Sequence, residues 1–172
     1  MKHIKVFEQF INEARAIPVT LEPGDFEKDG SIWGYYQYGD RGNTWRVHSD
    51  YFVDMEKGND PYEQDVVFLE YSEGKTGGLM KTPDSKKVCY LKIGLINNLK
   101  RQSASTYGKN FKFFPGEDID KVSKEAAKFL FDKDHFKWLN KNIKAEGKSL
   151  RIKLKGDFSG VIKKLLQEAN FK

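Results

Sequence analysis

The sequence predicts an α+β protein with a mainly antiparallel sheet of about five to six strands, followed by two to three helices. Three observations support this class. Segments rich in β-branched and aromatic residues, separated by Gly, Pro, Asn and Asp, fill most of the chain before Pro115. After Gly116 the spacing of apolar residues changes to three and four, which is typical of helices. Strands that mostly precede helices, rather than alternate with them, indicate an α+β domain.

Six segments before Pro115 are predicted as extended or strand structure. Pro18 disfavours helix both at itself and at the preceding residue, so a short extended segment is expected there, followed by a turn over 23–25. Residues 45–54 alternate between apolar and polar side chains, as a half-buried strand does. A hairpin loop over 39–43 precedes this strand, and a flexible loop is expected over 74–78. The segments are 17–21, 31–38, 45–54, 66–71, 88–93 and 110–114.

The part of the chain after Gly116 is predicted to hold three helices and one more strand. A helix is expected over 119–130, with Asp118 favourable at its N-terminus. A second helix, capped by Asp134, is expected before an alternating strand over 150–154. The last helix is expected to begin after a cap at Asp157 or Ser159.

The first fifteen residues are predicted to form a short amphipathic helix. Its charged residues are two lysines and two glutamates before Ala14, so residues 1–13 carry no net charge. We expect residues 1–13 to be a separate N-terminal helix and residues 14–172 to be a single α+β domain. Packing of this helix on the protein's own domain is the alternative interpretation. The apolar stripe consists of Ile4, Phe7, Ile11 and Ala14, with Phe10 beside it.

The opening segment resembles the capsid-targeting peptide of internal head proteins in T-even-type tailed phages. The residues that carry the resemblance are Met1-Lys2 and the run Phe10-Ile11-Asn12-Glu13-Ala14-Arg15. The resemblance covers residues 1–15 alone. It implies that a prohead protease reads Ile11 and Glu13 and cuts between Glu13 and Ala14, with the phage scaffold as another partner of residues 1–13. It also implies a phage-encoded protein of the virion interior or the host cytoplasm.

The composition narrows the range of functions. Cys89 is the only cysteine, so an intramolecular disulfide is excluded. No apolar run approaches the roughly 20 residues that span a bilayer, so no membrane partner is expected. His3, His48 and His135 are scattered, and no cofactor or metal is expected. Gly74-Lys75-Thr76 resembles the end of a phosphate-binding loop, but Leu69 stands where that motif needs a glycine.

Charge is segregated along the chain, and this pattern suggests contact with a polyanion. Residues 14–73 carry a net charge of −8, residues 74–114 carry +8, and residues 115–172 carry +5. One interpretation is a basic face that attracts a polyanion such as DNA, or binds a host protein. In the other, the acidic and basic parts neutralise each other as neighbouring strands. The candidate contacts are Lys86, Lys87, Lys92, Lys100, Arg101, Lys109, Lys112, Lys137, Lys141, Lys144, Arg151 and Lys153.

Two further features remain open at the level of sequence. Phe111 and Phe113 fall on one face of the strand predicted over 110–114, where they either stack on nucleic-acid bases or belong to the core. Asp40, Asp50 and Asp54 lie in or near the predicted hairpin and would form the acidic site of a small hydrolase or transferase if they converge. The first hypothesis is therefore a non-catalytic binding protein, and the alternative is an enzyme.

Overall fold

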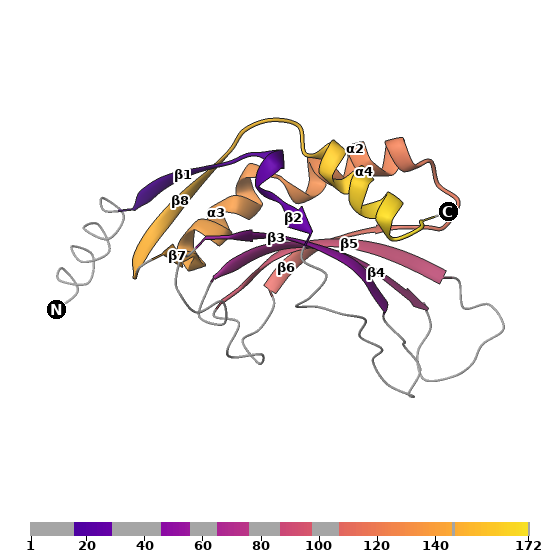
Figure 1. The fold of residues 1–172 in the computed structure, drawn as a ribbon, viewed down its shortest axis with the longest axis horizontal. Helices are drawn as coiled ribbons and strands as arrows, with labels where there is room; N and C mark the ends of the chain where they lie inside the picture. Colours follow the sequence, from indigo (N-terminus) through magenta and orange to yellow (C-terminus); the bar gives the residue numbers. More distant parts are fainter. Residues whose placement is uncertain are drawn as a thin grey trace.

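The structure is a computed structural model that describes residues 16–28, 46–55, 65–75, 87–97, 107–145 and 147–171. Within these residues the chain forms two sheets and three α-helices, and a short 3-10 turn, η1, follows the first strand (Figure 1). The predicted α+β class is confirmed. The elements are β1 (Ile17–Leu21), η1 (Pro23–Asp25), β2 (Glu27–Lys28), β3 (Arg46–Asp54), β4 (Val66–Lys75), β5 (Lys87–Ile96), β6 (Tyr107–Phe113), α2 (Ile119–Leu130), α3 (Lys133–Asn142), β7 (Lys144–Ala145), β8 (Lys148–Leu154) and α4 (Ser159–Glu168).

The larger sheet is antiparallel and has the strand order β2-β3-β4-β5-β6. Its two central strands, β4 and β5, are paired along ten residues each, from Val66 opposite Ile96 to Lys75 opposite Lys87. The register of β3 against β4 shifts between Val47 and Ser49, which marks a β-bulge. This sheet corresponds to the mainly antiparallel sheet that the alternating segments predict.

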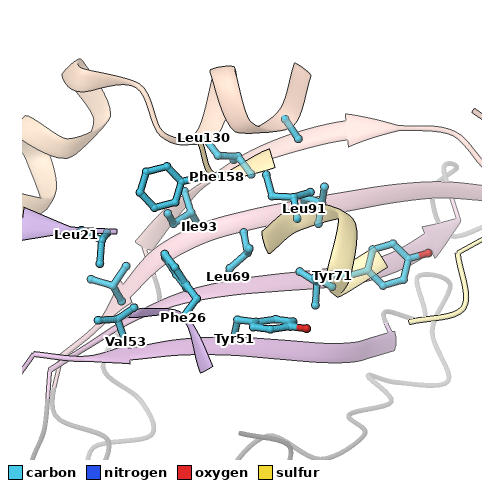
Figure 2. Close-up of a cluster of buried hydrophobic side chains, with 14 of the residues drawn as sticks. Leu21, Phe26, Tyr51, Val53, Leu69, Tyr71, Leu91, Ile93, Leu130 and Phe158 are labelled. Atoms are coloured by element: carbon cyan, nitrogen blue, oxygen red, sulfur yellow. The ribbon is translucent and has the colours of Figure 1, made fainter. Parts of the chain in front are cut away.

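Helices α2 and α4 cover one face of the larger sheet (Figure 1). Alternate residues of the central strands point to these helices, because successive side chains of a strand lie on opposite faces. Leu69, Tyr71, Leu91 and Ile93 are fully buried in this layer. Figure 2 shows these side chains beside Leu130 of α2, Phe158 and other buried residues. The core thus lies between the sheet and the two helices.

A second, smaller sheet pairs the first strand of the described chain with two strands that precede the last helix. Its order is β1-β8-β7, with β1 parallel to β8 and β7 antiparallel to it. Helix α3 packs on β8, and its Asn140 side chain donates to the carbonyl of Ile152 and accepts from the same residue's amide. Leu150 and Ile152 are buried there and belong to the same core cluster as the larger sheet. The pattern of the sequence does not reveal this second sheet, because β1 lies far from β7 and β8 in the chain.

Several element boundaries differ from the predicted ones. Gly74 and Lys75, expected in a loop, belong to β4, because they continue the ladder opposite Val88 and Lys87. The cap of α3 is Asp132, whose carboxylate accepts from the amide of Asp134, so the prediction of Asp134 as the cap is wrong.

Other predicted features agree with the structure, differ from it or fall outside its described part. Asp118 caps α2 and accepts from the amide of Lys121 at 2.8 Å. The N-cap of α4 is Phe158, so the prediction of Asp157 or Ser159 as the cap is wrong, although the Asp157 carboxylate accepts from the amide of Ser159 at 2.9 Å. The helix predicted over 1–13, the strand over 31–38 and the loop over 39–43 lie outside the described residues.

Gly108 of β6 is expected to be intolerant of any side chain. A Cβ at this position would meet the carbonyl oxygen of Ile93 and lie 3.1 Å from the Cα of Gly94, because β5 and β6 are directly paired there. We expect Gly108→Ala to lower the free energy of unfolding by about 1–3 kcal/mol through overpacking. Urea unfolding measures this loss. Gly24→Ala is the matched control, since no atom lies within 4 Å of its Cβ; an equal effect of the two changes would contradict the packing argument.

Candidate polyanion interface

The lysines of β5 lie beside acidic residues of β4. The ammonium of Lys87 is 2.6 Å from a carboxylate oxygen of Glu73. Lys92 stands opposite Glu70 in the ladder, and its ammonium also lies 5.4 Å from the centre of the Phe68 ring. The acidic and basic segments therefore neutralise each other along this strand pair, as the second interpretation of the charge pattern expects. Lys87 and Lys92 are poorly placed to attract a polyanion.

The Glu70 carboxyl group of β4 lies in an environment that disfavours its charged form. Burial raises its pKa from an ordinary value of 4.5, and the charge of Lys92 offsets only part of this rise. Asp50 of β3 occupies the ladder position opposite Glu70, on the other side from Lys92. Sequence reasoning missed Glu70, because only the strand register brings it between these two residues.

The two candidate lysines of β6 lie on opposite faces of the sheet. Lys109 pairs with Ile93 on the helix side, and its ammonium lies 4.3 Å from the centre of the Phe129 ring. Lys112 pairs with Tyr90 on the other side, with its ammonium 5.5 Å from the Phe114 ring. The structure therefore does not bring these lysines together. Lys86, Lys100 and Arg101 lie outside the described residues.

The aromatic residues of β6 belong to the core rather than to a base-stacking surface. Phe113 is 2% exposed and packs edge-on against Phe171 with ring centres 5.1 Å apart. Phe111 is half-buried and stacks on Phe113, with a second contact to Phe129. Since these rings are held by neighbouring rings, they are not free to stack on nucleic-acid bases.

The candidate residues near the C-terminus fall into two groups on different sides of α3 and β8. Lys137 and Lys141 are exposed on α3, and the Lys137 ammonium is 2.6 Å from the carboxylate of Asp134. Lys144, Arg151 and Lys153 share the face of the smaller sheet that is turned away from α3, because their neighbours Leu150 and Ile152 point inward. The second group is the larger cluster of candidate residues on one described face.

We call this surface the outer face and define it by its strand positions. The parallel register places Arg151 beside Pro18 and Lys153 beside Thr20, while the antiparallel register places Lys144 beside Ser149. Five of these six residues are exposed and Ser149 is half-buried. The outer face consists of Pro18, Thr20, Lys144, Ser149, Arg151 and Lys153.

The charge of the outer face is positive. Its described strand positions hold three basic residues and no acidic one. Two described carboxylates lie at its margins. That of Glu22 is 2.7 Å from the ammonium of Lys155, and that of Asp65 accepts from the backbone amide of Lys144 at 3.1 Å. The strand register therefore places no acidic residue beside Arg151 or Lys153, unlike the register of the β4–β5 pair.

The structure describes only part of the predicted acidic site. Asp54 is exposed at the end of β3, and Asp50 lies four residues earlier in the same strand. Asp40 lies outside that part. Among the described residues no group of three or more His, Cys, Asp and Glu is suited to hold a metal ion.

Cys89 is buried and is not presented as a nucleophile. It has no exposed surface, and the Tyr71 hydroxyl lies 3.5 Å from its sulfur while donating to Glu73 at 2.6 Å. Burial is the main cause that raises the pKa of the Cys89 thiol, so the reactive thiolate form is scarce at neutral pH. Its role in this structure is to fill the core.

Comparison with protein-family models, with curated proteins and with solved structures finds no match to this chain. Among the residues described by the structure, no helix is both long and apolar enough to cross a lipid bilayer.

The pH dependence of stability tests the environment of Glu70. Because its pKa is raised in the folded state, ionisation of this carboxyl opposes folding as pH rises through and above 4.5. Glutamine stays neutral, so we expect Glu70→Gln to gain stability relative to the wild type between pH 4 and pH 7. Urea unfolding at both pH values measures the difference.

Asp120→Asn is the matched control, for which the change of stability with pH is expected to have the opposite sign. Hydrogen bonding and the charge of Lys163 lower the pKa of Asp120, so this carboxylate stabilises the fold at neutral pH and loses that contribution on acidification. Asp120→Asn should therefore be less favourable at pH 7 than at pH 4. A stability difference for Glu70→Gln that is flat with pH, or that falls as pH rises, would contradict the argument.

Proposed function

We propose that this chain is a phage-encoded, non-catalytic protein that binds DNA through its outer face and is carried in the phage head through residues 1–15. The observation that supports the binding activity is the exposed basic surface of Lys144, Arg151 and Lys153 on a sheet face without a covering helix among the described elements. The proposed places of action are the virion interior and, after injection, the host cytoplasm. The phage scaffold and the prohead protease are the proposed partners of residues 1–13.

The chemistry of the outer face favours contact with phosphates rather than with bases. It contains no aromatic residue that would stack on a base. Alternate residues of a strand are spaced about 6.6 Å apart, so Arg151 and Lys153 present two cationic groups in a row along β8. Arginine can hold a phosphate with two parallel N–H groups, whereas lysine acts as a point charge. Such contacts position a protein on DNA without reading its sequence.

There are two alternatives to DNA binding: a different partner for the outer face, and an enzymatic activity. An acidic surface of a host protein would be attracted to the same face by the same charges. The enzyme alternative, built on Asp40, Asp50 and Asp54, has no converging geometry in its favour within the described residues. We therefore propose binding without turnover.

Reversing two charges of the outer face is expected to weaken DNA binding. For Arg151→Glu/Lys153→Glu we expect at least a tenfold loss of affinity for a fluorescently labelled DNA duplex at low salt, measured by anisotropy. The slope of log affinity against log salt should also decrease by about 2, because about one counterion is released for each phosphate contact. The structural reason is that both side chains are exposed on the face turned away from the core.

The control variant changes net charge by the same amount at another place. Lys121→Glu/Lys164→Glu alters two exposed lysines of α2 and α4 and should leave the affinity nearly unchanged. Equal losses for the two double variants would mean that only total charge matters. A wild-type affinity that does not respond to salt would refute polyanion binding, and retained binding of an acidic host protein would then favour the alternative partner.

Packaging is expected to leave a defined new N-terminus. If residues 1–13 direct the chain into the head and are then removed, the protein in purified virions should begin at Ala14. Glu13→Gln should be packaged but keep its original N-terminus, because it removes the carboxylate before the cut. Mass spectrometry of virions made with each chain measures both outcomes. Absence of the wild-type chain from virions would contradict the targeting proposal.

A further inference from the structure

An apolar groove runs along β1 on the side opposite to the outer face. Its volume is about 380 Å³. The apolar lining comes from the inward side of β1, from the end of β3, and from β7 and β8. Thr20 of β1 also borders the groove, and Asp25 and Asp54 add carboxylates. We call it the β1 groove; its principal apolar residues are Ile17, Val19, Leu21, Val53, Met55, Ala145 and Leu150.

The described helices leave the groove incompletely covered. Helix α3 packs on β8, so the inward residues Leu150 and Ile152 of that strand are buried. On the neighbouring strand β1, by contrast, Ile17 is 37% exposed and Val19 is only partly buried. A sheet buries its apolar face by packing another layer against it. The β1 side of this sheet therefore has room for one more apolar element beside α3.

We infer that residues 4–14 of the same chain dock in the β1 groove. Fifteen residues precede Ala16, and the chain enters β1 at Ile17, itself a groove residue. If residues 4–14 are helical, as their apolar spacing predicts, only Arg15 and Ala16 connect them to β1. Two residues suffice for a helix-to-strand connection in which the helix packs back along the strand that follows.

The lengths of the two elements match. Eleven helical residues span about 16 Å at 1.5 Å per residue. The five residues of β1 span about 16 Å at 3.3 Å per residue. A helix lying antiparallel to β1 would thus cover the strand from Ile17 to Leu21, with Ala14 at the Ile17 end.

The chemistry of the segment also fits. Its stripe of Ile4, Phe7 and Ile11 is apolar, as the groove is. In the antiparallel arrangement its lysine-bearing start lies at the Leu21 end of β1, and Asp25 follows that end within four residues. Lys5 is thereby brought toward the end of β1 that holds the carboxylates of Glu22 and Asp25 beside Lys155. Apolar burial drives the docking, and this charge pairing favours its direction.

This inference does not rest on the proposed function, because it concerns the place of the segment before any partner binds. It has a consequence for that function. Docking buries the apolar stripe that a scaffold or a protease would bind, so such a partner must compete with the groove for residues 4–14. The segment would then be available to a partner only when it leaves the groove.

Cross-linking within the full chain tests the docking. Phe7→Cys/Met55→Cys places one thiol on the stripe and one in the groove, whereas Phe7→Cys/Phe129→Cys places the second on α2, where Phe129 is 40% exposed. Cys89 is buried and common to both chains. With bismaleimidoethane, we expect the groove pair to form the intramolecular cross-link at least ten times faster than the control pair. Ile17→Glu should lower the rate of the groove pair to that of the control.

Hydrogen exchange of the unmodified chain gives a second measurement that does not depend on any variant. Amides of residues 4–14 should exchange at least ten times more slowly in the full chain than in a free synthetic peptide of residues 1–15. Equal exchange rates, or equal cross-linking of the two cysteine pairs, would overturn the docking. Cross-linked dimers as the main product would also overturn it, because the groove would then receive the segment of another copy.

Discussion

The structure depends on the parallel pairing of β1 with β8, two strands that are separated by more than a hundred residues. All five residues of β1 have a partner, from Ile17 opposite Leu150 to Leu21 opposite Leu154. The amide of Lys155 donates to the carbonyl of Leu21 at 3.0 Å and continues the connection beyond the strands. Because strand residues alternate between faces, this one pairing builds a basic surface on one side and an apolar groove on the other.

The exposed edge of β8 shows how the pairing is held in place. Strand β7 is only two residues long, so it leaves most of that edge without a strand partner. The carbonyl of Ile143 accepts from the amide of Leu150 at 3.2 Å, and the Asn140 side chain binds both backbone groups of Ile152. Helix α3 thus takes the place of a further strand. Satisfying these groups also limits edge-to-edge association at this position.

The two charge clusters differ in which residues the strand register places beside them. Along β4 and β5 the strand register sets Glu70 against Lys92, and Glu73 pairs with Lys87, so the opposite charges of neighbouring segments cancel. Arg151 and Lys153 instead lie beside Pro18 and Thr20, which carry no charge. Net charge per segment could not distinguish these cases, because cancellation depends on which strands become neighbours. It is this difference that singles out the outer face among the predicted basic residues.

Local patterns in the sequence predicted much of the fold. The alternation of residues 45–54 and the apolar spacing of residues 119–130 each identified a single element, and β3 and α2 confirm them. Local patterns gave the wrong secondary structure where pairing with a distant strand determines it. Gly74 and Lys75 have the composition of a loop, yet pairing with β5 makes them part of strand β4. The alternating residues of 150–154 were predicted as a strand, but nothing local showed that β1 would lie beside them.

The candidate site was predictable only in part, because it too depends on residues that are distant in the chain. The sequence supplied Lys144, Arg151 and Lys153 together with nine other basic residues, and it could not separate them by face. The sequence did not decide whether Phe111 and Phe113 belong to a binding surface or to the core, because the face of a strand that is buried depends on what packs against it. Here Phe129 and Phe171 supply that packing. Secondary structure thus followed from local spacing, while the site depended on tertiary neighbours.

The two faces of β1 allow the two proposed activities to coexist. Pro18 and Thr20 share the outer face in the strand register, whereas Ile17 and Val19 line the groove, which Thr20 also borders. A helix docked in the groove would lie on the opposite side of the sheet from bound DNA and would not cover Arg151 or Lys153. Docking would also bury the exposed part of Ile17 and stabilise the strand on which the outer face is built. Removal of residues 1–13 would then leave the basic surface in place while weakening the strand that supports it.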